Sequence, residues 1–153
     1  MKQNPDITIF VLNWNGAEDT IECLTSLQNL EYDNYSVVVI DNNSDDNSNK
    51  RIKEKFPKQA IVELPQNYGY AGGNNSGFKN VIDKETKYVL FLNNDTTVDK
   101  KFLNKLVDGI NKFGSDVILS PKIYYQNDPG RIWFAGATIN FYTGNISHLG
   151  IRE

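Results

Sequence analysis

Short apolar runs alternate with longer amphipathic or polar stretches along most of the chain. The runs are rich in β-branched residues and too short for helices, so they predict buried strands. The predicted strands are Ile7–Asn13, Tyr35–Ile40, Ala60–Leu64, Tyr88–Leu92 and Val117–Ser120. Strands that alternate with helices indicate βαβ units and a mostly parallel sheet with right-handed crossovers.

The stretches between these strands carry the spacing of amphipathic helices. The helix after Gly16 is expected to bury Ile21, Leu24, Leu27 and Leu30. A shorter helix that ends before Pro57 is expected to have Ser44 or Asp45 as its N-cap and to carry Ile52 and Phe56. A later helix, capped by Asp99, is expected to bury Phe102, Leu103, Leu106, Val107, Ile110 and Phe113.

The pattern changes after Pro121. Trp133–Phe134, Thr138–Tyr142 and Asn145–Leu149 alternate as strands around a turn at Thr143–Gly144, which predicts a β-ribbon. The predicted fold is therefore α/β: a Rossmann-like, mostly parallel sheet flanked by helices, with a C-terminal antiparallel β-ribbon. The length predicts a single domain over residues 1–153.

A glycine-rich segment, Asn67–Gly77 (NYGYAGGNNSG), is predicted to be a loop that enters a helix carrying Val81 and Ile82. Glycine lets the backbone approach a ligand closely, and a helix N-terminus suits a phosphate. The spacing matches neither the dinucleotide fingerprint nor the P-loop. The alternative is a tight turn with close helix–sheet packing.

Composition and charge narrow the classes of function. The net charge is −3 and the chain has no Lys/Arg-rich run, so no nucleic-acid partner is expected. The single Cys23 excludes an internal disulfide and fits a reducing compartment. No apolar run approaches the ~20 residues of a membrane span, and Met1–Asp6 does not resemble a signal peptide. We therefore expect a soluble, cytoplasmic protein.

Polar clusters follow the first four predicted strands. They are Asn13–Gly16, Asp41–Asp46, the glycine-rich segment and Asn93–Asp95. In an open parallel sheet, ligands bind outside the carboxyl ends of the strands. The four clusters therefore predict one site at one rim of the sheet.

Two acids and three ring side chains are candidates for roles in that site. Asp41 is placed to accept hydrogen bonds from a ligand or to cap the next helix, and the caps predicted at Ser44 and Asp45 favour the ligand. Asp95 is either the carboxylate of a Mg²⁺ or Mn²⁺ site completed by substrate phosphates, or an Asx-turn residue. Surface or packing roles are expected for His148, and Tyr68 and Tyr70 either pack or flank a base or sugar.

The succession NWNG, VIDNNSDD, NYGYAGGNNSG and FLNNDT resembles the N-terminal region of family 2 glycosyltransferases with the GT-A fold. The likeness extends from Ile7 to about Gly150 and is strongest to the rhamnosyltransferase-like branch, which builds bacterial cell-surface polysaccharides. It implies an inverting, metal-dependent hexosyl- or rhamnosyltransferase. The implied donor is a dTDP- or UDP-sugar, the acceptor is a hydroxyl of a glycan or lipid-linked substrate, and the cofactor is Mn²⁺ or Mg²⁺.

The resemblance also implies residue roles. Asp41 would bind the pyrimidine base, and Asp95 would bind the metal in a DXD-like motif whose first acid is replaced by Asn93. Many family members have Arg where this chain has Asn74. The other nucleotide-sugar-binding residues expected at the rim are Leu12, Asn13, Asn15, Asn43, Asn67, Gly72, Gly73, Asn74, Asn75 and Asn94.

The resemblance assigns no catalytic residue to this chain, because the family's general base lies in a later motif and is expected beyond Glu153. We therefore expect a shortened form that binds the donor without turnover, with peripheral association at the inner face of a membrane. Two alternatives stay open. One is a non-catalytic sugar-nucleotide-binding module; the other is a nucleotidyltransferase, which Asn13–Gly16 disfavours because the segment is short and uncharged.

Overall fold

The computed structural model describes residues 5–82 and 86–150, and the chain divides into two compact units, residues 1–101 and 102–153. The single domain expected from the chain length stays a prediction.

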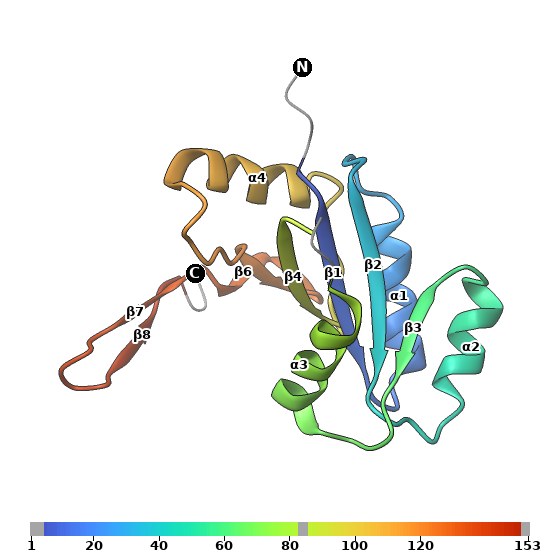
Figure 1. The fold of residues 1–153 in the computed structure, drawn as a ribbon. Coiled ribbons are helices and arrows are strands. Elements are labelled where there is room, and N and C mark those ends of the chain that lie inside the picture. The colour runs from blue at the N-terminus through green and yellow to red at the C-terminus, as the bar shows by residue number, and fades with distance from the viewer. Residues whose placement is uncertain (1–4, 83–85, 151–153) are drawn as a thin grey trace. The chain divides into compact units, whose positions relative to one another are not determined.

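The first unit is built on a four-stranded sheet whose strands all run parallel (Figure 1). The order across the sheet is β3-β2-β1-β4. The strands are β1 (Ile7–Asn13), β2 (Tyr35–Asp41), β3 (Ala60–Glu63) and β4 (Tyr88–Asn93). The positions of the first four predicted strands are confirmed to within a residue at each end, and so is the α/β fold class.

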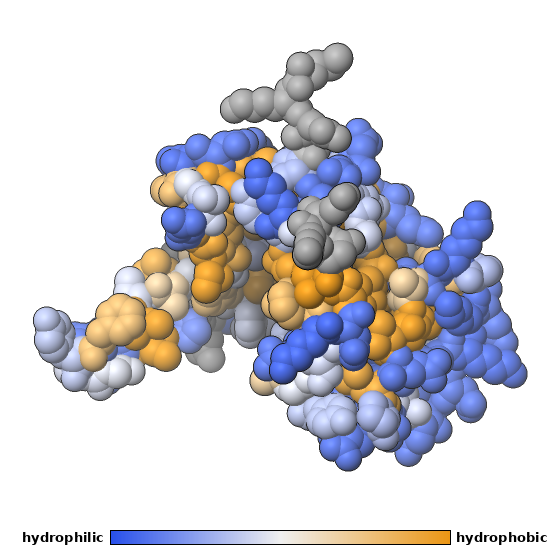
Figure 2. Space-filling model, in the orientation of Figure 1, coloured by the Kyte–Doolittle hydropathy of each residue, from blue (hydrophilic) through white to orange (hydrophobic). Residues whose placement is uncertain are grey.

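Three helices cover the sheet of this unit. The chain steps from β1 to β2 to β3 and then returns past β1 to β4. Because crossovers are right-handed, this reversal places the helices on both faces. In Figure 1, α1 (Ala17–Leu27) and α2 (Ser48–Lys55) lie on one face and α3 (Gly69–Val81) lies on the other. Figure 2 shows a hydrophilic surface over α2, whose only buried residues are Ser48 and Ile52.

The core on the α3 face is centred on Phe10. Its ring stacks on Phe91 with centroids 5.7 Å apart and meets Phe78 of α3 edge-on at 6.3 Å. Val38, Ile40 and Leu64 complete this buried cluster. On the other face, α1 buries the side chains of Ala17, Thr20, Cys23, Leu24 and Leu27.

The prediction of a loop at the glycine-rich segment is wrong, because α3 already begins at Gly69. A Cβ on Gly77 would lie 2.1 Å from Cδ1 of Ile40, and one on Gly73 would lie 2.8 Å from Cδ1 of Leu12. These two glycines are one helical turn apart and let α3 press against β1 and β2. The alternative of close helix–sheet packing describes them correctly.

Several further predictions differ from the structure, among them the helix cap at Asp99, because that helix begins only at Phe102. Val117–Ser120 is not a strand, because the parallel sheet ends at β4 and Leu119 instead packs against Gly109. The residue before α2 is Asn47, and Asp46 Oδ1 accepts the amide of Ser48, so neither Ser44 nor Asp45 caps this helix. Leu30 lies beyond the end of α1, and Phe113 is 62% exposed.

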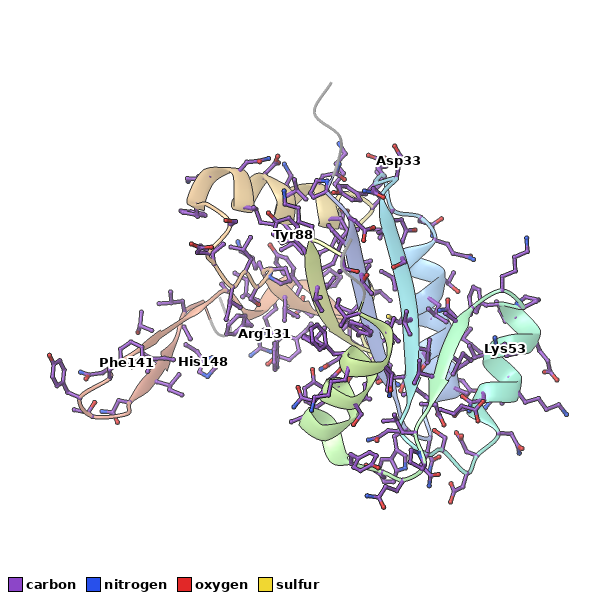
Figure 3. All side chains as sticks on the ribbon, viewed as in Figure 1. Asp33, Lys53, Tyr88, Arg131, Phe141 and His148 are labelled. Atoms are coloured by element: carbon purple, nitrogen blue, oxygen red, sulfur yellow. The ribbon has the colours of Figure 1, made fainter. Side chains whose placement is uncertain are left out.

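The second unit contains α4 (Phe102–Phe113) and two antiparallel pairs, β5 (Ile123–Tyr125) with β6 (Asp128–Phe134) and β7 (Ala137–Ile139) with β8 (Ile146–His148). The predicted ribbon is confirmed, with shorter strands and a turn in which Gly144 has φ +71°. His148 lies on β8 (Figure 3), and its ring meets Phe134 edge-on at 5.8 Å. This contact is a packing role, as the sequence suggested.

Candidate active site

The strand register brings the polar clusters of the first unit to one rim. Asn13 at the end of β1 lies opposite Asp41 at the end of β2, and Leu12 lies opposite Asn93 at the end of β4. The carboxyl ends of three neighbouring strands therefore finish side by side. The parallel register therefore gathers these residues at one edge of the sheet. In sheets of this kind, ligands bind at that edge.

Beneath this rim lies a buried hydrogen-bond network centred on Asp41, which is 2% exposed. Its Oδ1 accepts hydrogen bonds from Asn13 Nδ2 (2.8 Å) and Ser44 Oγ (2.6 Å). Its Oδ2 accepts from the Ser44 amide (3.1 Å) and from Asn49 Nδ2 (3.2 Å). A carboxylate has about four lone-pair sites, so the hydrogen-bonding capacity of Asp41 is used within the protein.

The turn after β1 is tied to the turn after β2 by a second set of bonds. The Asn15 amide donates to Ser44 Oγ (2.9 Å), and Asn15 Nδ2 donates to Asp45 Oδ1 (2.8 Å). The Asp45 amide returns a bond to Asn15 Oδ1 (2.9 Å). Asn15 and Asn43 adopt positive φ angles of 51° and 64°, which asparagine tolerates better than most residues. The two turns therefore form one connected wall.

Asn42 fixes the start of α3. Its Nδ2 donates to Asn67 Oδ1 (2.8 Å) and to the Gly69 carbonyl (3.2 Å), while its Oδ1 accepts the Tyr68 amide (3.0 Å). Gly69 has φ +69° and a Cβ placed there would meet nothing within 4 Å, so glycine is needed for the backbone turn rather than for space. Asn42 therefore fixes the backbone of residues 67–69, which lies at the rim next to the end of β2.

The end of β4 is arranged differently, because its acid faces outward. Asp95 is exposed, and no hydrogen bond to its carboxylate is found among residues 5–82 and 86–150. Asn93 Oδ1 accepts from the Tyr70 hydroxyl (2.9 Å), and Asn94 Nδ2 donates to Thr20 Oγ1 (3.1 Å). Asn93 is therefore bonded to α3 and Asn94 to α1, and the Asp95 carboxylate is left available to a ligand.

These segments enclose a cleft of ≈ 440 Å³ in the first unit. Among the described residues Asp95 is the only acid that lines it, and two aromatic side chains, Trp14 and Tyr70, are each 58% exposed beside it. The lining residues are Leu12, Trp14, Asn42, Asn67, Gly69, Tyr70, Asn93, Asn94 and Asp95. The cleft thus combines exposed aromatic rings, amide groups and one carboxylate.

Cys23 of α1 lies beside the end of β4, and its Sγ is 3.8 Å from the Asn93 carbonyl oxygen. Burial raises the pKa of Cys23 to about 12, and the nearby negative charge of Asp95 adds to the effect. A thiol with this pKa stays protonated at neutral pH. Cys23 therefore supplies no nucleophilic thiolate to the cleft.

The structure places the sequence-predicted residues in three groups. Leu12, Asn67, Asn94 and Asp95 line the cleft. Asn13, Asn15 and Asp41 belong to the network and the wall beneath or beside it. The remaining predicted residues are the exposed Asn43 and four residues within α3, namely Gly72, Gly73, Asn74 and Asn75.

Sequence reasoning missed several lining residues. Tyr70, for which packing and a place beside a base or sugar are the two expectations, has an exposed ring, and its hydroxyl donates to Asn93 Oδ1. Trp14 and Asn42 also line the cleft, and both belong to the polar clusters that follow β1 and β2. The available signal was their position, since both follow directly on residues that end buried strands.

Asp95 fits a divalent metal only if a ligand supplies most of the coordination. No group of three or more His, Cys, Asp or Glu side chains that could hold a metal occurs in the part of the chain that the structure describes. Mg²⁺ is often held by one or two carboxylates plus substrate phosphates. A carboxylate without a protein partner at the edge of a ligand-sized cleft suits that mode of binding.

No helix in the described ranges is both long enough and apolar enough to span a bilayer.

Comparison with known proteins adds a family match. The family described as glycosyl transferase family 2 matches residues 8–150. Glycosyltransferase GlyA of Streptococcus pneumoniae is 23% identical over 96% of this chain and 21% of its own length. The low-salt glycan biosynthesis hexosyltransferase Agl10 of Haloferax volcanii is 28% identical over 77% of this chain and 36% of its own length. The chain spans less than half the length of the curated relatives it matches.

Solved structures share the fold. The mannosyltransferase PcManGT from Pyrobaculum calidifontis, in complex with GDP-Man and Mn²⁺, superposes with a TM-score of 0.63 at 21% identity. That match covers 71% of this chain and 33% of PcManGT. S. aureus TarS 1–349 in complex with UDP-GlcNAc gives a TM-score of 0.58 at 27% identity, over 70% of this chain and 31% of the TarS chain. These neighbours are GT-A glycosyltransferases, as the sequence resemblance predicted.

Proposed function

The chain belongs to glycosyl transferase family 2, and from that premise we propose that its cleft binds a nucleotide-diphosphate sugar. The bound donor would serve an inverting transfer to a hydroxyl acceptor. The observation that supports this function best is the unpartnered Asp95 carboxylate at the edge of a cleft flanked by exposed aromatic rings. Relatives of the same fold are seen with UDP-GlcNAc and with GDP-Man and Mn²⁺.

The base is proposed to lie on the Trp14 side of the cleft. The Trp14 ring is 58% exposed and offers an apolar face on which a base can stack. Asn67 Oδ1 already accepts two hydrogen bonds, from Asn42 and from the Gly69 amide, so its Nδ2 is the group available to donate to the base or ribose. Asp41 is proposed to act from beneath, because its own acceptors are occupied and it holds Asn13 and Ser44 in place.

The diphosphate is proposed to lie on the Asp95 side of the same cleft. Asp95 would hold Mn²⁺ or Mg²⁺ together with the phosphate oxygens. The metal, when bound, supplies positive charge that stabilises the leaving nucleoside diphosphate. Tyr70 and the Asn93 side chain, joined by a 2.9 Å hydrogen bond, line the cleft beside it at the end of β4.

The finer parts of the proposal rest on the sequence resemblance. The donor is a dTDP- or UDP-sugar and the transfer is of hexosyl or rhamnosyl type. The acceptor is a glycan or lipid-linked hydroxyl in cell-surface polysaccharide synthesis at the cytoplasmic face of a membrane. The name of Agl10, a glycan biosynthesis hexosyltransferase, supports a glycan product. Residues 1–153 are proposed to carry the donor and metal site of this transfer.

A non-catalytic sugar-nucleotide-binding module is the second candidate. One observation favours it: Asp95 is the only carboxylate among the residues that line the cleft. If Asp95 holds the metal, the cleft lining offers no second acid to deprotonate an acceptor hydroxyl. A module would bind the UDP-sugar and release no UDP with any acceptor, even in the longer context typical of the relatives.

The test is a thermal-shift panel of UDP, dTDP, GDP and CDP, each with and without Mn²⁺ or Mg²⁺. Ligand at about a hundred times its Kd adds ~2.7 kcal/mol of stability. For a chain of this length that corresponds to a rise in Tm of roughly 5–10 °C. We expect one pyrimidine diphosphate to give a rise that requires metal. No shift with any of the four nucleotides would contradict donor binding.

A matched pair of variants locates the metal. Asp95→Asn removes the unpartnered carboxylate and should abolish the metal-dependent part of the shift. Asp45→Asn removes a carboxylate at the same rim that bonds Asn15 and is outside the cleft lining, so it should keep that part. Loss of the metal effect in both variants, or in neither, would put the metal elsewhere.

A further inference from the structure

Thr20 is a buried residue of α1 with no place in the cleft lining. Its side chain is 0% exposed, and its backbone amide donates to the Gly16 carbonyl in the first turn of the helix. Its hydroxyl donates to Asn13 Oδ1 (2.9 Å) and accepts from Asn94 Nδ2 (3.1 Å). Both functions of a single hydroxyl are therefore in use.

These two bonds make Thr20 the link between the opposite sides of the rim. On one side, Asn13 is bound to Asp41 and Ser44 through its Nδ2. On the other side, Asn94 precedes Asp95, the unpartnered acid of the cleft. The continuous path Asp41–Asn13–Thr20–Asn94 thus runs from the end of β2, through β1 and α1, to the end of β4.

The position of Asn94 depends on few contacts besides this path. Its Nδ2 also reaches the Gly16 carbonyl, but at 3.4 Å, which is long for a hydrogen bond. A Cβ on Gly16 would lie 2.8 Å from the same Nδ2, so the amide already fills the space above the helix start. Loss of the Thr20 hydroxyl leaves the Asn94 side chain with one weak partner among the described residues.

We propose that Thr20 is a positioning residue for metal-dependent donor binding. Its hydroxyl fixes Asn94, and Asn94 fixes the adjoining backbone, so that the Asp95 carboxylate stands where a metal–diphosphate complex needs it. The inference rests on the proposed donor site. It adds a role for a buried helix residue that contacts neither the nucleotide nor the metal.

The experiment compares three variants by isothermal titration of UDP, or of dTDP if it ranks first in the panel, with and without Mn²⁺. Thr20→Val keeps the shape and removes the hydroxyl. Thr20→Ser keeps the hydroxyl and removes a methyl group. Thr25→Val makes the same change on the same helix, where the hydroxyl is exposed and bonds only the Ile21 carbonyl.

The readout is the ratio of the Kd without Mn²⁺ to the Kd with Mn²⁺. We expect Thr20→Val to lower this ratio about tenfold, the size of one or two lost hydrogen bonds. Its metal-free Kd should stay within about twofold of the wild-type value. Thr20→Ser should restore most of the ratio, and Thr25→Val should leave it unchanged.

A purely structural role for Thr20 would give a different result. Thr20→Val would then lower the unfolding midpoint in urea and weaken both Kd values equally, with the ratio intact. That result, or a ratio that Thr25→Val lowers as much, would overturn the inference. If wild type itself shows no Mn²⁺-dependent binding of either nucleotide, the proposed donor site fails and the role of Thr20 fails with it.

A second variant covers the case in which Thr20→Val does not fold. Gly16→Ala pushes a methyl group toward Asn94 Nδ2 from the other side and leaves the Thr20 hydroxyl intact. Gly16 has φ −138° and ψ 52°, so alanine meets no positive-φ strain there, and circular dichroism checks that the variant folds. The same loss of the Mn²⁺ ratio is expected, and an unchanged ratio in a folded Gly16→Ala protein would contradict the proposal.

Discussion

Two strands of the sheet, β2 and β4 on either side of β1, each lead into an aspartate at the same rim, and the two acids have opposite surroundings. Asp41 ends β2, is 2% exposed, and accepts four hydrogen bonds from its own chain. Asp95 follows β4 by two residues and is exposed, with no partner for its carboxylate in the described ranges. Asp41 therefore stabilises the turns of the site, and the Asp95 carboxylate is available to a ligand.

The chain after each strand causes this difference. After β2, the positive φ of Asn43 turns the backbone so that the Ser44 amide and hydroxyl both meet the Asp41 carboxylate. After β4, Thr96 Oγ1 donates to the Asn93 carbonyl (2.6 Å) and not to the acid. An apolar strand followed by an aspartate is thus one sequence pattern with two structural outcomes. The outcome depends on whether the hydrogen-bond donors of the following residues reach the carboxylate, as those of Ser44 do and that of Thr96 does not.

The largest effect is expected from Asp41→Asn. The new amide would face the Ser44 amide and Asn49 Nδ2 with a donor where an acceptor is needed. Buried donors left unpaired cost enough that we expect the free energy of unfolding to fall by about 3 kcal/mol. Urea denaturation monitored by circular dichroism measures this change.

The control for that experiment is Asp95→Asn. An exposed carboxylate without a protein partner contributes little to folding, so the variant should stay within ±0.5 kcal/mol of wild type. Equal losses of stability in the two variants would remove the contrast between the two acids.

A smaller effect is expected from Trp14→Ala, which tests whether the nucleotide also contacts the cleft away from Asp95. Stacking of a base on an aromatic ring contributes about 1–3 kcal/mol, so nucleotide affinity should fall roughly tenfold. The loss should be the same with and without Mn²⁺, because Trp14 stacks on the base and leaves the metal untouched. Isothermal titration measures both values.

Tyr68→Ala is the matched control for Trp14→Ala. The Tyr68 ring is 42% exposed near the start of α3 but does not line the cleft. Its removal should leave nucleotide affinity within about twofold. A nucleotide affinity that Trp14→Ala does not change would move the base to another wall.

The sheet could be predicted from sequence because its signals are local. Apolar β-branched runs such as Ile7–Asn13 mark the strands, and the alternation with helices sets the parallel order. Val117–Ser120 has the same local appearance, but Leu119 packs against Gly109 and the segment has no strand partner. Strand pairing is a tertiary property, and a single run of residues does not encode it.

For the site, only the residues that lie at the ends of the strands could be predicted from the sequence. The parallel register brought Asn13, Asp41 and Asn94 together as expected. The loop predicted over the glycines of α3 is wrong because glycine for close approach to a ligand and glycine for close helix–sheet packing look alike in sequence. Thr20 carried no signal at all, since a threonine on the buried face of a helix is ordinary until Asn13 and Asn94 are seen to meet it.

The most direct test of the central claim is paramagnetic broadening of backbone amide signals by Mn²⁺ in the ¹⁵N-labelled protein saturated with UDP or dTDP. The account predicts the strongest broadening at Asn94 and Asp95, and its disappearance in Asp95→Asn. Strongest broadening at the exposed acids Glu18 and Asp19 of α1, unchanged in Asp95→Asn, would contradict a metal and diphosphate site at the end of β4.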